Sequence, residues 1–188
     1  MRNNPKLVIL DRDGVINHDS DAFVKTLSEF IPIAGSIEAI ARLSQAGFFI
    51  AVASNQSGLA RGLVTEQALA EMHQFLLDAV GAAGGKIEMI AFCPHGPDSN
   101  CDCRKPKPGL LHAIAAELHI PLDKSVVVGD SYRDLEAAWS VGAAAVLVLT
   151  GKGAITFDSH PELAQKLPVF ADLASFADHL LKESAKHG

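Results

Sequence analysis

The sequence lacks a long apolar stretch in its 188 residues. Its first apolar run, Leu7–Leu10, is cut short by Asp11 and is far shorter than the apolar core of a secretory signal. The longest later run, residues 141–149, is also well short of the roughly 18 residues that a membrane-spanning helix needs. We therefore predict a protein without a membrane segment, and we expect it in the cytoplasm.

The sequence also lacks an excess of positive charge. It contains 16 Lys and Arg residues against 22 Asp and Glu residues, which gives a net charge of -6. Proteins that hold a polyanion normally carry a basic face, so we do not expect nucleic acid as a partner. Small anions are not excluded, because a few local cations are enough to bind them.

Cysteine is scarce and lies in one place. The three cysteines, Cys93, Cys101 and Cys103, fall in one short segment. An odd number so close together is a poor disulfide framework, and it indicates a reducing compartment or a metal site.

What the sequence does have is a regular alternation of short apolar runs and helical patterns. Continuous apolar runs are typical of strands that are covered on both faces, as in a parallel sheet. The predicted strands are Lys6–Leu10, Phe48–Ala53, Ile87–Phe92, Ser125–Gly129 and Ala145–Leu149. With helices between them, they predict a single α/β domain over residues 1–188, with a doubly wound, mostly parallel, Rossmann-like sheet.

The helix boundaries follow from capping residues. Ser36 is predicted to cap a first helix that ends at Gly47, and Thr65 to cap a second one that ends at Gly84. Pro108 suits the first turn of a third helix. Two further helices are predicted over Tyr132–Val141 and Leu173–Ala185, the latter being the single helix expected after Gly153.

Polar residues at the carboxyl ends of parallel strands are candidates for a site, because ligands of open α/β sheets bind there. Asp11 and Asp13 follow the first predicted strand, and residues two apart at a strand end point the same way. One carboxylate could attack phosphorus while the other protonates the leaving oxygen. The alternative is a turn that contains a helix-capping aspartate.

Two other strand ends carry groups that suit a phosphate. Ser54, Asn55, Gln56 and Ser57 follow the second predicted strand, where a hydroxyl and backbone N–H groups could hold phosphate oxygens or merely cap a helix. The basic segment 104–108 precedes a helix, and its Lys105 could neutralise both the phosphate and Asp11. We interpret Lys107 as solvated.

The fourth predicted strand ends at Gly129 and is followed by Asp130. A hard Mg²⁺ ion prefers oxygen ligands, and Asp130 beside Asp11 would supply a second carboxylate. Mg²⁺ and Lys105 together would offset the repulsion between the carboxylates and a phosphate dianion. For Asp134 a helix-capping role and a role in the site both remain open.

The cysteine segment has the spacing of a zinc site. Cys93 and His95 are separated from Cys101 and Cys103 by five residues. Four such ligands in one loop can close a tetrahedral zinc site without an open position, which is a structural site. We predict that zinc pins the loop over residues 93–103, directly before Arg104 and Lys105; buried thiols or surface residues are the alternatives.

These motifs carry a family resemblance. Asp11-x-Asp13, Ser54, Lys105 and Gly129-Asp130, in this order, resemble the four motifs of the haloacid dehalogenase-like phosphatase superfamily, without a large cap insertion. Together with the zinc loop, they resemble the D-glycero-D-manno-heptose 1,7-bisphosphate 7-phosphatases. The related histidinol-phosphate phosphatases share the zinc loop and the core motifs.

The resemblance implies a role for each motif residue. Asp11 would be the nucleophile and Asp13 the general acid and base. Ser54 and Lys105 would stabilise the phosphoryl group, and Arg104 would recognise the substrate. Catalytic Mg²⁺ would bind to Asp11, Asp130 and the carbonyl of Asp13, and structural Zn²⁺ to the cysteine loop. The implied substrate contacts are Asp19, Ser20, Asp21, Ala22, Phe23, Ser54, Asn55, Gln56, Ser57, Arg104 and Lys105.

The resulting hypothesis is a monomeric enzyme that removes the 7-phosphate of the heptose bisphosphate through an aspartyl-phosphate, for the synthesis of bacterial lipopolysaccharide. Histidinol phosphate is the alternative substrate, and a polynucleotide phosphatase fits the acidic balance less well. A phosphoacceptor signalling module and a zinc-stabilised interaction domain without catalysis are alternatives of other classes. Arg61 could reach a second phosphate or be solvated.

Overall fold

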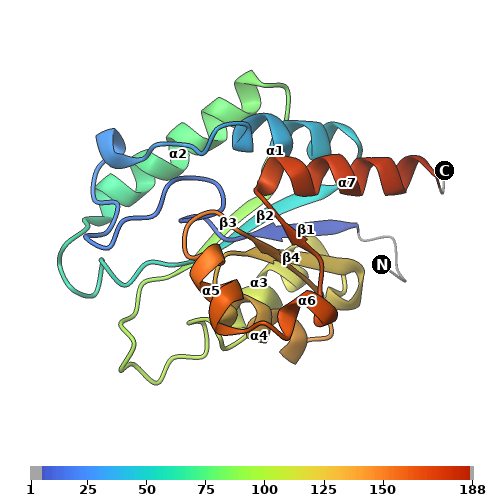
Figure 1. Ribbon diagram of the computed structural model, residues 1–188. Coiled ribbons are helices and arrows are strands. Elements are labelled where there is room, and N and C mark those ends of the chain that lie inside the picture. Colours follow the sequence, from blue (N-terminus) through green and yellow to red (C-terminus); the bar gives the residue numbers. More distant parts are fainter. Residues whose placement is uncertain (1–5, 187–188) are drawn as a thin grey trace.

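The computed structural model describes residues 6–186, which form one parallel sheet covered by helices on both faces (Figure 1). The order of the strands in the sheet is β3-β2-β1-β4-β5-β6. Their bounds are Leu7–Leu10 for β1, Phe49–Asn55 for β2, Met89–Cys93 for β3, Ser125–Gly129 for β4, Ala144–Val148 for β5 and Val169–Phe170 for β6. Every neighbouring pair is parallel, which confirms the predicted doubly wound sheet.

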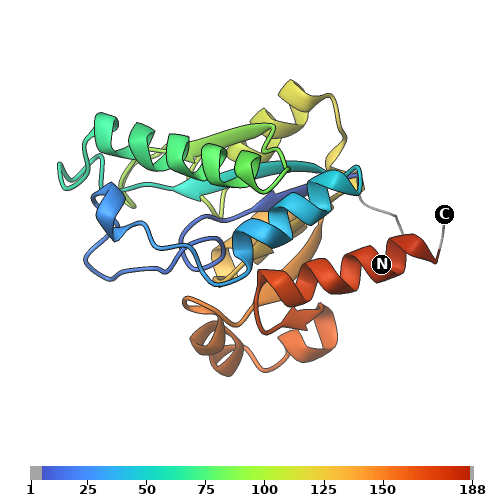
Figure 2. The same ribbon diagram turned by 90° about the horizontal axis from the view of Figure 1, so that it is seen from above.

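Three helices cover one face of the sheet, and they lie side by side when the molecule is seen from above (Figure 2). They are α1 (Ser36–Gln45), α2 (Glu66–Ala82) and α7 (Leu173–Ala185). The other face carries α3 (Gly109–Leu118), α4 (Tyr132–Ser140), α5 (Gly153–Ser159) and α6 (Leu163–Lys166). Short 3-10 helices occur at Leu27–Glu29 and Leu122–Lys124.

The central strand β1 contributes to both hydrophobic cores. Val8 and Leu10 pack into the core under α1, α2 and α7, whereas Leu7 and Ile9 pack into the core under α3 and α4. All four side chains are completely buried. Since alternate residues of a strand point to opposite faces, a strand that is buried on both faces must be apolar throughout. This requirement explains the continuous apolar run at Leu7–Leu10.

The position of β1 also determines where a site can form. β1 lies between β2 and β4; the chain runs from β1 to β2 on one side and from β4 to β5 on the other, so the connections diverge between β1 and β4. Leu10 is in register with Val52 of β2 and Val128 of β4. The residues that follow these three positions therefore meet at the crevice beyond the strand ends, which is the usual place for a ligand in such sheets.

Two predictions about local structure are wrong. Ser36 does not cap α1: Gly35 occupies the N-cap with a φ of 79°, and the Ser36 hydroxyl donates to the carbonyl oxygen of Ile16 at 2.7 Å. A positive φ suits glycine, and the serine instead ties the helix to the segment after β1. The chain after Gly153 also forms more than one helix, because α5, α6 and β6 precede α7.

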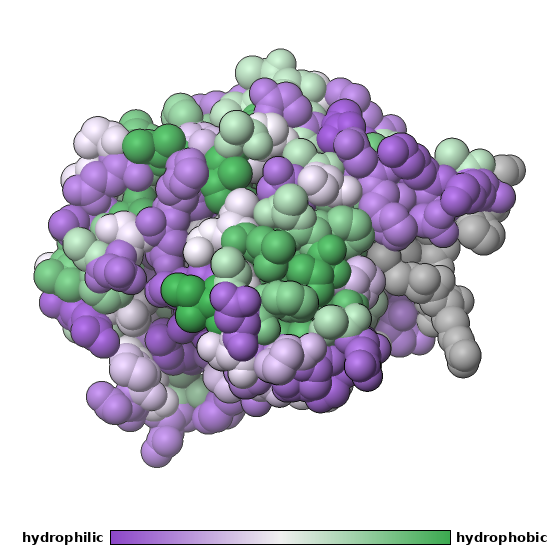
Figure 3. Space-filling model, viewed as in Figure 1, coloured by the Kyte–Doolittle hydropathy of each residue, from purple (hydrophilic) through white to green (hydrophobic). Residues whose placement is uncertain are grey.

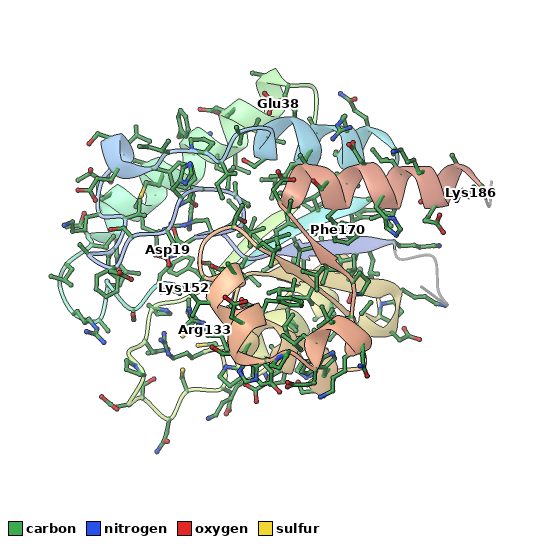
Figure 4. The ribbon with its side chains drawn as sticks, in the orientation of Figure 1. Asp19, Glu38, Arg133, Lys152, Phe170 and Lys186 are labelled. Atoms are coloured by element: carbon green, nitrogen blue, oxygen red, sulfur yellow. The ribbon has the colours of Figure 1, made fainter. Side chains whose placement is uncertain are left out.

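The strand missed by the sequence, β6, has only two residues and pairs with the end of β5. Apolar side chains gather over this edge of the sheet in the space-filling view (Figure 3). Phe170 lies in this region (Figure 4), where its ring contacts that of Phe176 at 5.7 Å between centroids. Two residues are too few to show a strand period, so the pattern could not reveal β6.

Within residues 6–186, none of the helices combines the length and the apolar character that a membrane crossing requires.

The Thr65 cap, by contrast, is confirmed, because the Thr65 hydroxyl oxygen accepts a hydrogen bond from the N–H of Ala68 at 3.1 Å. Thr65→Ala should lower the free energy of unfolding by about 1 kcal/mol, since this N–H loses its partner. Thr65→Ser keeps the hydroxyl and should stay close to the wild type. Urea denaturation followed by circular dichroism measures both values. Equal losses in the two variants would contradict the cap assignment.

Candidate active site

The carboxyl ends of β1, β2, β4 and β5 surround a polar cleft. Most of the residues that line it had been predicted from the sequence; the lining consists of Asp11, Asp13, Asp19, Ser20, Asp21, Phe23, Val24, Ser54, Asn55, Gln56, Ser57, Arg104, Asp130, Arg133 and Lys152. Figure 4 shows Asp19, Lys152 and Arg133 next to one another on one side of this cleft. Ala22 is not among the lining residues, and Lys105 lies behind them with 2% of its surface exposed.

The floor of the cleft is an ion cluster centred on Lys105. Its ammonium nitrogen Nζ lies 3.0 Å from Asp11 Oδ1 and 2.6 Å from Asp134 Oδ1. It also donates to the carbonyl oxygen of Ala53 at 2.7 Å. Three acceptors match the three protons of an ammonium group, so the direction of this side chain is fully determined.

The backbone of Lys105 is held as firmly as its side chain. The Asn55 side chain makes two hydrogen bonds with it: its amide nitrogen donates to the carbonyl oxygen of Lys105 at 3.0 Å, and its oxygen accepts from the N–H of Lys105 at 3.0 Å. Asn55 therefore joins β2 to the segment before α3, across 50 positions of sequence.

Burial and neighbouring charges shift the pKa values in this cluster in different directions. Burial raises the pKa of Asp11 to about 6 against the opposing charge of Lys105. Burial, with the Asp11 and Asp134 carboxylates, raises the pKa of Asp130 to about 7. Burial alone would also raise the pKa of Asp134, but Lys105 outweighs it and the pKa is lowered. Lys105 therefore compensates the charge of Asp134 more fully than that of Asp11, and Asp130 has no cation from the described residues in contact with it.

A divalent cation would compensate the remaining negative charge of these carboxylates. Carboxylate oxygens of Asp11, Asp130 and Asp134 lie within 4.8 Å of one another, a spacing that suits shared oxygen ligands. Asp134 is already engaged, because its Oδ2 accepts from the N–H and the hydroxyl of Ser131 and its Oδ1 faces Lys105. The donor set therefore fits Mg²⁺, with Asp11 and Asp130 as the side chains that would hold it.

The position of Asp130 depends on two glycines. A Cβ atom on Gly14 would lie 2.0 Å from Asp130 Oδ2, and one on Gly151 would lie 2.2 Å from the same atom. The N–H of Lys152 donates to Asp130 Oδ2 at 2.8 Å, and the Thr156 hydroxyl donates to the Asp130 carbonyl at 2.9 Å. The Asp130 carboxylate thus lies closely against two glycines on one side and is held by fixed donors on the other.

Asp13 sits in a different environment from Asp11. Its carboxylate accepts hydrogen bonds from Arg12, Asn17 and Gln56. Arg12 is fully buried and pairs with Asp13 at 2.9 Å. Burial alone would raise the pKa of Asp13, but Arg12, Asn17 and Gln56 outweigh it, so the pKa is lowered. This arrangement favours the ionised form of Asp13, so the carboxylate has to leave some of these donors and take up a proton before it can act as a general acid.

The cysteine loop has the geometry of a tetrahedral metal site. Cys93 Sγ lies 3.7 Å from Cys101 Sγ, 3.1 Å from Cys103 Sγ and 3.6 Å from His95 Nδ1. A Zn–S bond of about 2.3 Å in a tetrahedron implies S···S separations of about 3.8 Å. The four donor atoms lie within 4.8 Å of one another, so the set fits zinc.

Comparisons with known proteins agree with this site. A family model described as HAD-hydrolase-like matches residues 102–176. Proteins named D-glycero-beta-D-manno-heptose-1,7-bisphosphate 7-phosphatase match the chain: the one from Pseudomonas putida is 54% identical and covers 94% of this chain and 99% of its own length. The one from Neisseria meningitidis serogroup A is 49% identical, with 96% and 97% covered. The chain belongs to this phosphatase family.

A solved structure supports the assignment to the heptose bisphosphate phosphatases. The D,D-heptose 1,7-bisphosphate phosphatase of Bordetella bronchiseptica, complexed with magnesium and phosphate, has a TM-score of 0.88 and 48% identity. The two structures match over 95% of this chain and 99% of the Bordetella chain. The fold is thus haloacid dehalogenase-like, and no large cap is present in the part of the chain that the structure describes.

The sequence missed two residues that line the cleft, Arg133 and Lys152. Lys152 could have been found, because it follows β5 and the rule for strand carboxyl ends applies there too. Its Nζ lies 3.0 Å from Asp19 Oδ2, which joins the loop after β5 to the predicted substrate loop. The sequence left two roles open for Asp134, and the structure shows both: Asp134 forms an ion pair with Lys105 and completes a capping box with Ser131.

Two other basic residues lie outside the cleft lining: Arg61, for which the sequence leaves two roles open, and Lys107, which it predicts to be solvated. The Arg61 guanidinium is exposed and lies over the ring of Phe23, 5.6 Å from its centroid. Lys107 is exposed, as predicted, and its Nζ donates to the carbonyl oxygen of Cys101 at 2.9 Å. Arg61 therefore contacts Phe23, a residue of the cleft lining, and does not itself line the cleft.

Removal of a zinc ligand should release the metal and loosen the loop. We expect His95→Ala to lower the zinc content of the purified protein well below one per chain and to lower its melting temperature, because a structural zinc site contributes folding free energy. Elemental analysis and differential scanning calorimetry measure the two effects. His112→Ala, an exposed histidine of α3, is the matched control. Full zinc occupancy and an unchanged melting temperature in His95→Ala would argue against the site.

Proposed function

We propose that this protein is a magnesium-dependent phosphatase that removes the 7-phosphate of D-glycero-β-D-manno-heptose 1,7-bisphosphate through an aspartyl-phosphate on Asp11. The names of its relatives support the substrate. The observation that carries the mechanism is the Asp11 carboxylate, held 3.0 Å from the buried Lys105 ammonium at the end of β1.

In the first half of the reaction, an Asp11 oxygen attacks phosphorus and forms an acyl phosphate, while the bond from phosphorus to the sugar oxygen breaks. Asp13, protonated and turned away from its donors, gives its proton to that leaving oxygen. In the second half, Asp13 takes a proton from water, and the resulting hydroxide attacks phosphorus. Inorganic phosphate leaves, and the Asp11 carboxylate is restored.

Lys105 and Ser54 stabilise the transferred group. Lys105 keeps its charge because, although burial alone would lower its pKa, the Asp11 and Asp134 carboxylates outweigh this effect and raise it. Its ammonium offsets the negative charge that gathers around phosphorus, and the Ser54 hydroxyl donates to a phosphate oxygen. Bound Mg²⁺, held by Asp11 and Asp130, would neutralise further charge on the phosphate.

The charge at the cleft favours a bisphosphate over histidinol phosphate. Arg104, Arg133 and Lys152 line the cleft beside the catalytic carboxylates. Lys152 is paired with Asp19, so the two arginines are the cations left for a second phosphate. Histidinol phosphate carries an amine in place of that phosphate, and like charges would repel. We propose that Arg104 and Arg133 bind the 1-phosphate.

We further expect this reaction to take place in the cytoplasm and to serve the synthesis of lipopolysaccharide. A monomeric state and the absence of a nucleic-acid partner remain predictions from composition. The thiols of Cys93, Cys101 and Cys103 support a reducing compartment, because zinc needs them unoxidised.

A substrate panel tests this proposal. With Mg²⁺, the release of inorganic phosphate should show a kcat/KM for the heptose 1,7-bisphosphate at least about tenfold above that for histidinol phosphate or fructose 1,6-bisphosphate, since tenfold is about 1.4 kcal/mol of selective binding. EDTA should abolish release from all three. A preference for histidinol phosphate would favour the alternative substrate, and one phosphoryl group bound per chain without turnover would favour a signalling module.

Replacement of the nucleophile tests the intermediate. Asp11→Asn should lower kcat by about four orders of magnitude or more, the scale on which removal of a nucleophile falls. The circular dichroism spectrum should stay that of the wild type. Asp123→Asn, an exposed aspartate before β4, is the matched control and should keep full activity. An active, metal-dependent Asp11→Asn protein would refute covalent catalysis at this residue.

A further inference from the structure

The side-chain amide of Gln56 lies between three groups of the active site. Its nitrogen Nε2 donates to Ser54 Oγ at 2.8 Å and to Asp13 Oδ2 at 2.8 Å. Its oxygen Oε1 accepts from Arg12 Nη2 at 3.2 Å. Gln56 is 6% exposed, so little water competes for these contacts. All of the polar atoms of this amide are therefore used within the site.

The neighbours of Gln56 permit one orientation of the amide. With the amide reversed, its oxygen would face the Asp13 carboxylate and its nitrogen would face the Arg12 guanidinium. Both contacts would then join like partners, two acceptors or two donors. The Arg12–Asp13 ion pair, at 2.9 Å, thus acts as a clamp that holds the N–H groups of Gln56 toward Ser54 and Asp13.

The contact with Gln56 determines what Ser54 can do. A serine hydroxyl has one proton and rotates freely, so its direction depends on its neighbours. Because Ser54 Oγ accepts a hydrogen bond from Gln56 Nε2, the hydroxyl proton of Ser54 points away from Gln56. Ser54 lines the cleft and is 1% exposed, so this proton is available to an acceptor inside the cleft.

We propose that Gln56 is a positioning residue that orients the Ser54 hydroxyl as a donor to the transferred phosphate, with the Arg12–Asp13 pair holding the amide in place. The inference rests on the proposed phosphatase function and deepens it. Gln56 had been expected to contact the substrate; here it acts through Ser54. The same amide also links the phosphate-binding side of the cleft to the carboxylate of the general acid.

A double-mutant cycle tests this role. Gln56→Met keeps the size of the side chain and removes its hydrogen bonds, and Ser54→Ala removes the hydroxyl. The substrate is 4-nitrophenyl phosphate with Mg²⁺, because its leaving group needs no proton and effects on Asp13 are minimised. In the presence of Ser54, Gln56→Met should lower kcat/KM about tenfold and weaken inhibition by inorganic phosphate, as expected for one misdirected hydrogen bond.

In the Ser54→Ala background the same change should lower kcat/KM by less than about threefold, because residues that act through one another are not additive. Equal factors in the two backgrounds, or no effect of Gln56→Met on phosphate inhibition, would overturn the proposal. Gln67→Met, at an exposed glutamine of α2, is the matched control and should match the wild type.

Gln56→Glu supplies a second variant if Gln56→Met folds poorly. A glutamate carboxylate would accept a hydrogen bond from the Ser54 hydroxyl and turn that hydroxyl away from phosphate, so we expect a loss at least as large as that in Gln56→Met. Activity equal to the wild type in Gln56→Glu would contradict the donor role. If the wild type does not hydrolyse the aryl phosphate or the heptose bisphosphate, the proposed function fails; if it does and the cycle is additive, this inference alone fails.

Discussion

The site depends on the buried ammonium of Lys105. Asp11, Asp130 and Asp134 bring three carboxylates within 4.8 Å of one another, an arrangement that costs free energy in a buried place. Lys105 contacts Asp11 and Asp134 and leaves Asp130 without a cation. This division leaves Asp134 committed to structure and Asp130 open to a cation, which suits the roles proposed for Asp11 as nucleophile and for Asp11 and Asp130 as metal ligands. The geometry of Lys105 is in turn held by Ala53 and Asn55 on β2.

Similar carboxylates have different tasks because their partners differ. Asp13 is surrounded by donors, and its pKa is lowered, whereas the pKa of Asp11 is raised to about 6 by burial. To act as the proposed general acid and base, the Asp13 carboxylate has to give up some of these hydrogen bonds and move toward the leaving oxygen. Arg12 serves both groups at once: its side chain pairs with Asp13, and its backbone N–H donates to Asp11 Oδ1 at 2.7 Å. A residue between two catalytic aspartates can therefore control both.

The zinc loop extends this ordering to the rim of the cleft. Cys93 ends β3, and Cys103 precedes Arg104 and Lys105, so one metal ion would join the sheet to the segment that carries the catalytic lysine. Arg104 also donates to the carbonyl oxygen of His95 at 3.2 Å. A loop of this length would otherwise be free to move, and a mobile Lys105 could not hold its three acceptors. The structural metal and the catalytic site are thus parts of one arrangement.

The sequence by itself predicted five of the six strands that the structure describes, the parallel character of the sheet and the motif residues at the strand ends. Each follows from local pattern: short apolar runs between helical patterns suit strands buried on both faces, and polar residues directly after parallel strands meet at one edge. The tertiary structure alone decided the partners of those residues. The pairing of Lys105 with Asp134, the Gln56 contact with Asp13, the reach of Lys152 to Asp19 and the short strand β6 all depend on how separate segments pack. A contact between residues so far apart in the chain leaves no periodic trace in the sequence.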